Sequence, residues 1–298
     1  MPAYAIIGGN RYVGRRVVEK LIETGADITL VNRGKTLDSF GNRVKRKKAD
    51  ASKARELSEA LKGNFDAILH QVAFTKSESE SLIKSLENLG TRVVVTSSIA
   101  VYNFAQCTAP FREGDMSLRN IKECDIREDY LASPFLNQYA TGKMKMEHAI
   151  MNSKLENIAI PRLGHVLGHD DPTERFQFMV RKAHLYNTNT MQGKYFTSFI
   201  TADSAAEKLV ELLRSDYIGP INIADSVMSL NEIMSLLKMN RLPSDRNNIT
   251  DDEQWPFVYE HDYYMDTTVQ DSLLQTRSMF RNRIARETMM VCKQLKSK

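Results

Sequence analysis

A tyrosine and a lysine four positions apart are the side chains in this sequence best suited to proton transfer. An α-helix would place Tyr139 and Lys143 on one face, one turn from each other. A phenol has a pKa near 10 and is a poor acid–base group at neutral pH. An ammonium about 4 Å away contributes roughly 4 kcal/mol at an effective dielectric of about 20, which would lower the phenol pKa by about two or three units. Tyr139 would then exchange a proton with a substrate oxygen.

Ser98 is a third candidate for the same chemistry. It follows the apolar run Val93–Val95, at the end of an expected strand. In a parallel sheet the carboxyl ends of the strands meet at one edge, where ligands bind. We therefore expect its hydroxyl to hydrogen-bond the same substrate oxygen as Tyr139. The alternatives are a turn or cap role for Ser98 and, for Tyr139 and Lys143, a pair of surface neighbours.

A glycine turn near the start of the chain predicts a diphosphate site. The apolar run Tyr4–Ile7 ends at Gly8 and Gly9, and Gly14 opens a segment with apolar residues at helical spacing, namely Val13, Val17 and Leu21. Glycines let the backbone approach phosphates, and a helix N-terminus presents free N–H groups and a partial positive charge. A second apolar run, Ile28–Val31, follows at the distance that a βαβ unit requires.

The elements that must position these residues alternate between strand and helix patterns. We expect strands at 3–7, 28–31, 44–48, 66–70, 92–96 and 157–161, and helices at 14–24, 52–61, 77–89 and 138–152. This alternation predicts an α/β fold with a doubly wound parallel sheet. Later segments predict a helix to Leu213 with Asp203 as its N-cap, a strand at 221–223, a helix at 229–238 starting near Ser229, mostly loop at 240–265 and helix at 268–296.

Length and composition are those of a globular protein. The chain has 298 residues, of which 42% are hydrophobic and 26% charged, and a net charge of +4, which suits a protein that holds phosphates. No apolar run approaches the roughly 20 residues of a membrane span, and we see no secretion signal, so we expect a cytoplasmic protein without a membrane partner. Three cysteines (Cys107, Cys124 and Cys292) match no metal or redox spacing, so we expect free thiols and no metal.

Four segments together resemble the extended short-chain dehydrogenase/reductases, the group that includes UDP-galactose 4-epimerase and sugar-nucleotide dehydratases. They are the glycine turn, the segment from Thr96 to Tyr102, Tyr139-x-x-x-Lys143 and the segment from Pro161 to Gly168. The resemblance covers about residues 3–238. With Val31-Asn32-Arg33-Gly34-Lys35, the turn is similar to a bacterial branch known only as epimerase/dehydratase-like. The resemblance implies a Rossmann domain over 1–165, to which 198–225 returns, and a smaller C-terminal substrate-binding lobe over most of 166–298.

The resemblance also implies roles for the matched positions. Ser98, Tyr139 and Lys143 would form the catalytic trio, with Tyr139 as acid/base and Lys143 on the nicotinamide ribose. A dinucleotide would contact Gly8, Gly9, Asn10, Arg11, Tyr12, Val13, Gly14, Asp50, Gln71, Val72 and Ala73. The implied reaction is hydride transfer at a secondary alcohol or ketone carbon. A sugar nucleotide or a related metabolite is the candidate substrate. Dehydratases of this family carry an acidic residue near the catalytic serine, and its absence after Ser98 favours a reductase or an epimerase.

Two departures from the family pattern concern the cofactor. Arg11 replaces the central glycine of the turn, so its side chain either hinders the turn or reaches the adenosine phosphate. Asn32 stands where NAD-preferring relatives carry an acid, which binds the ribose 2′-hydroxyl and repels a 2′-phosphate. With Arg33 and Lys35 nearby as cationic partners, we expect NADP(H) in preference to NAD(H). The alternative for Arg33 is a solvated loop charge.

Two residues are candidates for substrate contact. His165 replaces the asparagine that contacts substrate in many sugar-nucleotide members, which speaks against a UDP-sugar; it is either a substrate contact or a packing residue. Arg175 either meets a substrate phosphate or lies on the surface. In this family the helices matching 77–89 and 138–152 often pair across a two-fold axis, which favours a homodimer.

Two alternatives to an enzyme are an RNA-binding protein and a regulatory protein. The basic run Arg43–Lys48 is interpreted as a solvated strand edge and loop, with an RNA-binding surface as the alternative. The scaffold also suits a regulatory protein that senses NADP(H) without turnover. The complete trio of Ser98, Tyr139 and Lys143 argues against both, and the basic run has no interleaved aromatic residues for base stacking. We therefore expect a small-molecule substrate and no nucleic-acid partner.

Overall fold

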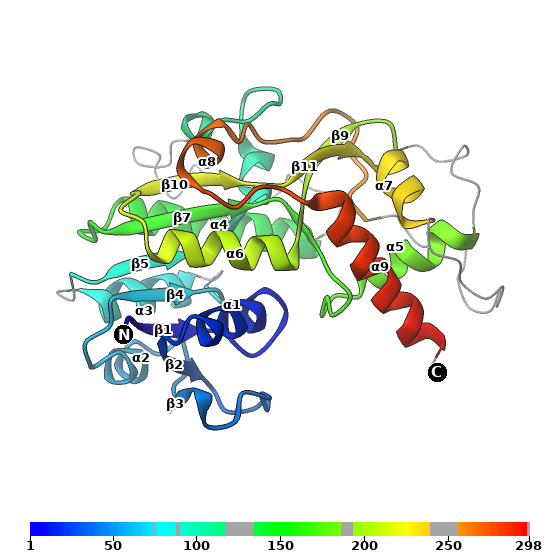
Figure 1. Ribbon diagram of the computed structural model, residues 1–298. Coiled ribbons are helices and arrows are strands. Elements are labelled where there is room, and N and C mark those ends of the chain that lie inside the picture. The colour runs from blue at the N-terminus through cyan, green and yellow to red at the C-terminus, as the bar shows by residue number, and fades with distance from the viewer. Residues whose placement is uncertain (74–75, 88–89, 117–133, 186–192, 239–255, 297–298) are drawn as a thin grey trace.

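A parallel sheet with the strand order β10-β7-β5-β4-β1-β2-β3 forms the centre of the fold (Figure 1). The computed structural model describes residues 1–73, 76–87, 90–116, 134–185, 193–238 and 256–296. The strands of this sheet are β1 (Ala3–Ile7), β2 (Asp27–Asn32), β3 (Lys45–Lys48), β4 (Ala67–His70), β5 (Arg92–Val95), β7 (Ile158–Leu163) and β10 (Gly219–Ile223), and a two-residue strand β6 (Ser97–Ser98) pairs with β7. All of these pairs are parallel, which confirms the predicted doubly wound sheet.

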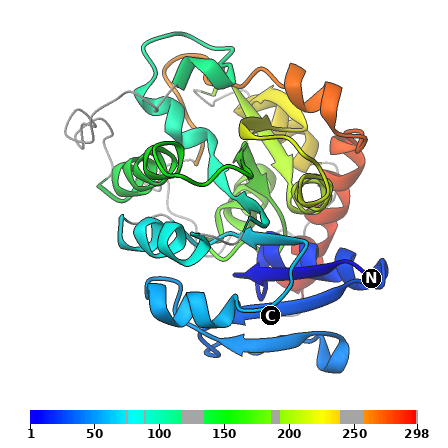
Figure 2. The same cartoon turned by 90° about the vertical axis from the view of Figure 1, so that its left-hand side faces the viewer.

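Helices cover both faces of this sheet (Figure 2). On one face lie α1 (Tyr12–Glu23) and α6 (Ala202–Leu213), and on the other α2 (Ala54–Ala60), α3 (Lys76–Leu86) and α4 (Pro134–Met151). Successive side chains of a strand point to opposite faces. Accordingly, Ile6 of β1 joins the core with α1 and α6, and Ile7 joins the core with α2, α3 and α4. The apolar strand runs are explained by burial on both sides.

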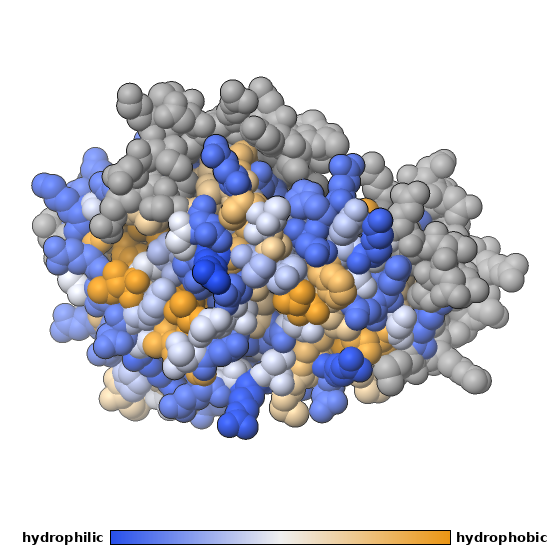
Figure 3. All heavy atoms as spheres, turned by 90° about the horizontal axis from the view of Figure 1, so that it is seen from above, coloured by the Kyte–Doolittle hydropathy of each residue, from blue (hydrophilic) through white to orange (hydrophobic). Residues whose placement is uncertain are grey.

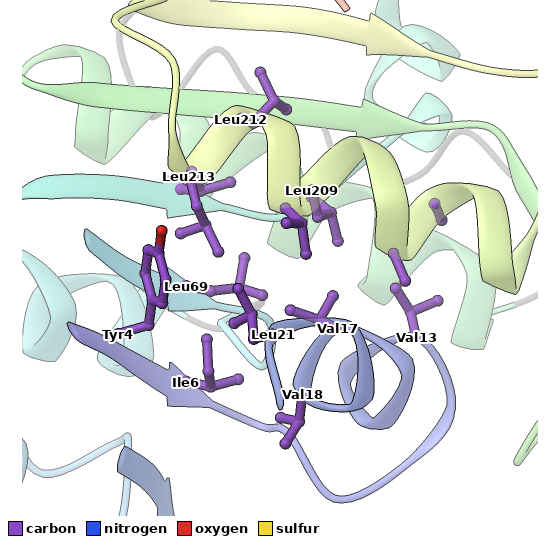
Figure 4. Packing of buried hydrophobic residues seen from close by; sticks show 14 of the residues in the cluster. Tyr4, Ile6, Val13, Val17, Val18, Leu21, Leu69, Leu209, Leu212 and Leu213 are labelled. Atoms are coloured by element: carbon purple, nitrogen blue, oxygen red, sulfur yellow. The ribbon is translucent and has the colours of Figure 1, made fainter. Parts of the chain in front are cut away.

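The packing of α1 against α6 follows from the spacing of the apolar residues in α1. Val13, Val17 and Leu21 recur every fourth position and point toward Leu209 and Leu213 of α6 (Figure 4). Val17, Leu21 and Leu209 are fully buried. Each such side chain stabilises the fold by roughly 1.5–3 kcal/mol relative to an exposed one. This contact fixes the N-terminus of α1 at the carboxyl edge of the sheet.

A second, smaller sheet lies in the C-terminal part of the chain. Its strands are β8 (His165–Leu167), β9 (Phe196–Thr201) and β11 (Ser226–Ser229), with β9 parallel to β8 and antiparallel to β11. Their core is shared with α5 (Arg175–Leu185), α7 (Leu230–Leu237) and α9 (Phe280–Lys296). The sequence analysis assigned no strand at these positions, because β8 and β11 are only three and four residues long. After β9 the chain returns to the large sheet. There α6 packs on one face, and β10 pairs with β7 as the edge strand.

Two predicted element boundaries need correction. The N-cap of α6 is Thr201, whose hydroxyl accepts the Ser204 N–H, so Asp203 lies in the first turn instead. The predicted helical stretch 268–296 is two helices, α8 (Thr268–Leu273) and α9, separated by residues 274–279. The prediction of a helix starting near Ser229 is confirmed, because Ser229 and Glu232 form a capping box.

The stretch 240–265, which was expected to be mostly loop, is described only from residue 256 onward. From there the chain passes beside β9 and the segment around Phe111. Tyr263 makes an isolated bridge with Thr197, and Met265 makes one with Phe111. This segment therefore brings residues near the end of the chain to the carboxyl edge of the large sheet.

The surface seen from above is mostly hydrophilic, with hydrophobic residues in small, separate patches (Figure 3). None of the helices in the described residues has the length and apolar character needed to cross a membrane. The basic strand β3 forms an edge of the large sheet. Lys45 of this strand pairs with Asp27 at 2.6 Å, and Arg46 pairs with Asp38 at 2.5 Å. Charged residues on an edge strand discourage pairing with another chain.

A buried arginine of α1 joins the two parts of the molecule. Arg16 is 5% exposed and donates to Asp203 of α6 at 2.8 Å, to Asp170 after β8 at 2.7 Å and to Glu287 of α9 at 3.3 Å. Glu287 also accepts the His169 backbone N–H at 2.7 Å. We call Arg16, Asp170, Asp203 and Glu287 the Arg16 cluster. It fixes the C-terminal helix and the segment after β8 against the first helix.

Candidate active site

The structure brings Ser98 and Tyr139 together. Ser98 ends β6 and is the N-cap of the 3₁₀ helix η2 (Ile99–Phe104), with its hydroxyl accepting the Ala100 N–H at 3.2 Å. The same side chain is hydrogen-bonded to the Tyr139 phenol. Ser98 is thus both a cap residue and a neighbour of Tyr139, so these two interpretations are compatible.

Lys143 follows Tyr139 by one turn of α4 and is buried. Its Nζ donates to the carbonyl oxygens of Ala73 at 2.8 Å and Thr96 at 2.7 Å, which follow β4 and β5. Burial lowers the pKa of Lys143 to about 8, although the charges of Glu147 and Glu78 act in the opposite direction. The lysine therefore connects α4 to the carboxyl ends of two central strands.

The direction predicted for the Tyr139 pKa is wrong in this structure. Burial raises the pKa of the phenol, while the hydrogen bond with Ser98 and the positive charge of Arg175 partly offset the rise. Lys143 Nζ lies 5.9 Å from the centre of the Tyr139 ring and donates to two carbonyl groups. The cation that acts on the phenol is thus Arg175, and Tyr139 is protonated at neutral pH.

A buried ion pair supports this part of α4. Glu147, one turn beyond Lys143, and Arg162 of β7 are both fully buried, with Nη2 of the arginine 2.7 Å from Oε2 of the glutamate. Ser97 donates to the same carboxylate, and a second nitrogen of Arg162 donates to the Tyr102 hydroxyl at 2.9 Å. Removing one partner of a buried pair costs about 3–5 kcal/mol. Sequence reasoning missed this pair, although an arginine inside the apolar run of β7 was a signal.

The glycine turn is packed too closely for side chains at its three glycines. Gly8 has a φ of +93°, and a Cβ atom there would lie 2.7 Å from Val72 Cγ1. At Gly14 a Cβ atom would lie 2.3 Å from the Gly8 carbonyl oxygen, so only glycine fits the close approach of α1 to the turn. At Gly9 it would lie 2.7 Å from Leu30 Cδ2. Val72 is 39% exposed beside the turn, where a bound dinucleotide would cover it.

Arg11 does not fill the turn. Its guanidinium reaches the loop after β2, where Nη2 donates to Thr36 Oγ1 at 3.1 Å. Asn10 donates to the Thr36 carbonyl at 2.7 Å, and Asn32 donates to Asn10 Oδ1 at 3.0 Å. This hydrogen-bonded network holds the turn against the loop. Arg11 thus extends from the turn to the loop after β2, and its contact with an adenosine phosphate stays a prediction.

The other candidates for the adenosine end surround the same loop. Arg33 and Lys35 are exposed. Asp50 follows β3, and hydrogen bonds from Ser52 together with the charge of Arg33 lower the pKa of its carboxyl group. Of the predicted cations, Arg33 is therefore the one whose charge acts on the Asp50 carboxylate.

Other predicted cofactor residues have packing partners. The Tyr12 hydroxyl donates to the Val166 carbonyl at 2.9 Å, and Val13 is buried in the core between α1 and α6. The Gln71 N–H donates to the Ile7 carbonyl at 3.1 Å, which places the segment after β4 beside the turn. For Tyr12 and Val13, contact with a dinucleotide would come from the backbone.

The structure also brings His165 and Arg175 to this site. His165 opens β8, two residues after Leu163, which pairs with Ser98. Its Nε2 lies 2.8 Å from the Tyr259 hydroxyl, and its ring centre lies 4.3 Å from that of Phe257. Burial lowers the pKa of His165 to about 3, so the imidazole is neutral at physiological pH.

Phe257 and Tyr259 are site residues that the sequence analysis missed. Both lie in the stretch that was expected to be mostly loop, and nothing local indicates that it returns to the sheet edge. Arg175 Cζ lies 5.1 Å from the centre of the Phe257 ring. We call His165, Phe257 and Tyr259 the aromatic wall.

Comparison with known families and structures agrees with this geometry. The model of the NAD dependent epimerase/dehydratase family matches residues 4–224. No curated protein matches the sequence.

Several solved structures share the fold. Vestitone reductase from alfalfa is 16% identical, with 100% of each chain covered and a TM-score of 0.74. UDP-N-acetylglucosamine 4-epimerase from Bacillus cereus is 19% identical, with 99% of each chain covered and a TM-score of 0.64. UDP-glucuronic acid 4-epimerase from Bacillus cereus, in complex with NAD, is 15% identical over 98% of this chain and 99% of that chain, with a TM-score of 0.67.

Proposed function

Because this chain belongs to the NAD dependent epimerase/dehydratase family, we propose that it is an NADP(H)-dependent oxidoreductase that acts at a secondary alcohol or ketone carbon. The observation that carries the proposal is the hydrogen-bonded pair of Ser98 and Tyr139, with Lys143 one turn away. This pair lies at the sheet edge to which the glycine turn also belongs. Ligands of doubly wound sheets bind at this edge.

The residues around the turn fit a dinucleotide. The partly exposed turn at Gly8 and the N-terminus of α1, which Gly14 lets approach the turn closely, would hold the diphosphate. Arg11 and Arg33 would hold a 2′-phosphate, because Asn32 offers no carboxylate to repel it. Lys143 would hold the nicotinamide ribose. When bound, the nicotinamide supplies or accepts the hydride.

Side chains of this protein transfer the proton. In the direction of reduction, Tyr139 donates the proton of its phenol to the carbonyl oxygen, and the Ser98 hydroxyl hydrogen-bonds the same oxygen. The raised pKa of Tyr139 keeps this proton in place at neutral pH. In the direction of oxidation, the phenolate accepts the proton of the alcohol. Positioned proton transfer of this kind contributes about 10²–10⁴-fold to a rate.

A single substitution tests the proposal. Tyr139→Phe should lower turnover with NADPH by about a thousandfold, since it removes the proton donor. Binding of NADPH, measured by fluorescence titration, should change little. Tyr217→Phe is the matched control: its hydroxyl bonds the Pro220 carbonyl at the start of β10, the opposite edge of the sheet. Full turnover by the folded Tyr139→Phe protein would overturn the proposal.

The basic run of β3 supplies no observation for a second function. Lys45 and Arg46 pair with aspartates of this chain, and Lys47 Nζ donates to the Lys62 carbonyl at 2.7 Å. This arrangement supports the interpretation of the run as a solvated strand edge.

A further inference from the structure

The aromatic wall is held rigidly beside the proposed catalytic pair. The Tyr259 and Tyr263 rings are stacked with centres 4.6 Å apart. The Tyr263 hydroxyl donates to the Ile99 carbonyl at 2.7 Å, and Ile99 directly follows Ser98. Tyr263 is 2% exposed, so this bond is buried. The wall is therefore fixed relative to the serine by contacts of the fold itself.

Two polar atoms of the wall bond each other. His165 Nε2 and the Tyr259 hydroxyl are 2.8 Å apart and satisfy each other. The Phe199 ring packs behind, with centres 5.8 Å from His165 and 5.9 Å from Phe257. His165, Phe257 and Tyr259 are each partly exposed, so a ligand beside them would meet mainly ring atoms and few groups suited to hydrogen-bonding sugar hydroxyls.

Phe257 has an unusual backbone conformation. Its φ is +64°, in the left-handed region that side chains other than glycine rarely adopt. Such residues cost about 1–3 kcal/mol and cluster at functional sites. This conformation accompanies the placement of the Phe257 ring between His165 and Arg175.

Arg175 carries a positive charge that its neighbours satisfy only in part. Its Nε donates to Thr173 Oγ1 at 2.7 Å, and the nearest carboxylate, on Asp171, is 3.8 Å away. Within the described ranges, no residue accepts a hydrogen bond from its two terminal amino groups. The charge of Arg175 acts on Tyr139 as well as on His165 and Tyr259. Its guanidinium lies over the Phe257 ring and so borders the aromatic wall.

From this arrangement we infer that the substrate is a ketone or alcohol that carries a planar ring and an acid group, either a carboxylate or a phosphate. The ring would pack against the part of the aromatic wall that its neighbours leave uncovered, and the acid group would pair with the terminal amino groups of Arg175. Aromatic stacking and charge-assisted hydrogen bonds are the interactions that these residues offer. The inference rests on the proposed function, since it places the reacting oxygen at Tyr139.

Four matched ketones test the ring and the charge separately. β-Benzoylpropionate has both, its methyl ester has only the ring, laevulinate has only the charge, and methyl laevulinate has neither. With NADPH, kcat/KM should be highest for β-benzoylpropionate and fall by about tenfold or more when either feature is removed. Equal values for laevulinate and β-benzoylpropionate would overturn the inference.

Two variants locate the contacts. Arg175→Gln should raise KM for β-benzoylpropionate about tenfold and leave its methyl ester unchanged. Phe257→Leu should lower kcat/KM for both aryl ketones and leave laevulinate unchanged. Arg281→Gln, an exposed arginine on α9, is the control and should change neither. An unchanged KM for β-benzoylpropionate in Arg175→Gln contradicts the inference while leaving the proposed function standing.

Binding distinguishes a failure of the inference from a failure of the proposed function. Calorimetry with NADPH-saturated Tyr139→Phe protein should show β-benzoylpropionate binding that Arg175→Gln weakens, even if no ketone is reduced. That result would support the inference while the proposed reaction fails. Tighter binding of UDP-N-acetylglucosamine, unaffected by Phe257→Leu, would overturn the inference in favour of a sugar nucleotide. Absence of binding by all four ketones would also overturn it.

Discussion

The two ends of the site are built in different ways. At the proposed adenosine end, the residues from Gly8 to Gly14 and from Asn32 to Lys35 come from two short stretches, and the cations Arg11, Arg33 and Lys35 are exposed. At the opposite end, the aromatic wall and Arg175 come from segments up to 94 residues apart, and the His165 imidazole is neutral. The first end is a local turn; the second exists only after the small sheet and the segment 256–265 have packed together.

Because of this difference, the two ends suit different parts of a bound molecule. A partly exposed turn with exposed cations suits a diphosphate that every member of a dinucleotide-binding family must hold. Rings fixed by tertiary contacts form a surface of one shape, which suits selection of a particular substrate. Variants that affect one end and leave the other unchanged therefore test whether the two ends have separate roles.

The largest effect is expected at the glycine turn. Gly14→Ala places a Cβ atom 2.3 Å from the Gly8 carbonyl oxygen, so the turn or α1 must shift. We expect NADPH affinity to fall by more than about a hundredfold and the melting temperature to drop by several degrees. Calorimetric titration and a thermal scan measure both.

The control for this variant is Gly114→Ala, because a Cβ atom at Gly114 meets nothing within 4 Å. Its NADPH affinity should equal that of the wild type. If Gly14→Ala also binds NADPH normally, the turn is not the diphosphate site and the comparison fails.

A smaller, pH-dependent effect is expected at Lys143, which lies between the two ends. Its pKa is about 8 in the folded protein and roughly 10.4 when unfolded, so the unfolded state binds more protons between these values. This lysine therefore makes the unfolding free energy rise with pH across that window, by about 3 kcal/mol. Below about pH 8 its contribution is constant.

Lys143→Met removes this titration. Its unfolding free energy, measured by urea denaturation between pH 7 and 10, should lack the rise seen in the wild type. Lys62→Met is the control and should keep the rise, because this lysine lies on the surface in an ion pair with Glu59. Parallel curves for wild type and Lys143→Met would show that the lysine titrates normally.

The smallest effect concerns the choice of cofactor. Arg33→Gln should raise KM for NADPH about tenfold and leave KM for NADH nearly unchanged, since only NADPH carries the 2′-phosphate. Steady-state kinetics with both cofactors measure this. A clear preference for NADH that Arg33→Gln leaves unaltered would refute the NADP(H) proposal. KM for the ketone should not change, because Arg33 belongs to the adenosine end.

The large sheet was predictable from the sequence and the small one was not. Continuous apolar runs such as Val93–Val95 mark strands that are buried on both faces, and the helices between them show regular apolar spacing. β8 and β11 are too short for a periodic signal, and their pairing with β9 depends on contacts between distant segments.

The candidate site divides in the same way. Ser98, Tyr139 and the glycine turn are local motifs, so their chemistry could be inferred from spacing. The pKa of Tyr139 depends on burial and on Arg175, neither of which the spacing with Lys143 reveals. Phe257 and Tyr259 reach the site only through tertiary bridges of the segment that contains them.

The Arg16 cluster has a consequence for the order in which the protein is made. Arg16 and Glu287 are 271 positions apart, so a ribosome adding about 5–20 residues per second reaches Glu287 roughly 15–50 s after Arg16. Throughout that interval the nascent first helix carries an arginine whose carboxylate partner on α9 has not been synthesised. The contact between α1 and α9 therefore forms late, after translation of α9 supplies Glu287, the last acidic group of the Arg16 cluster.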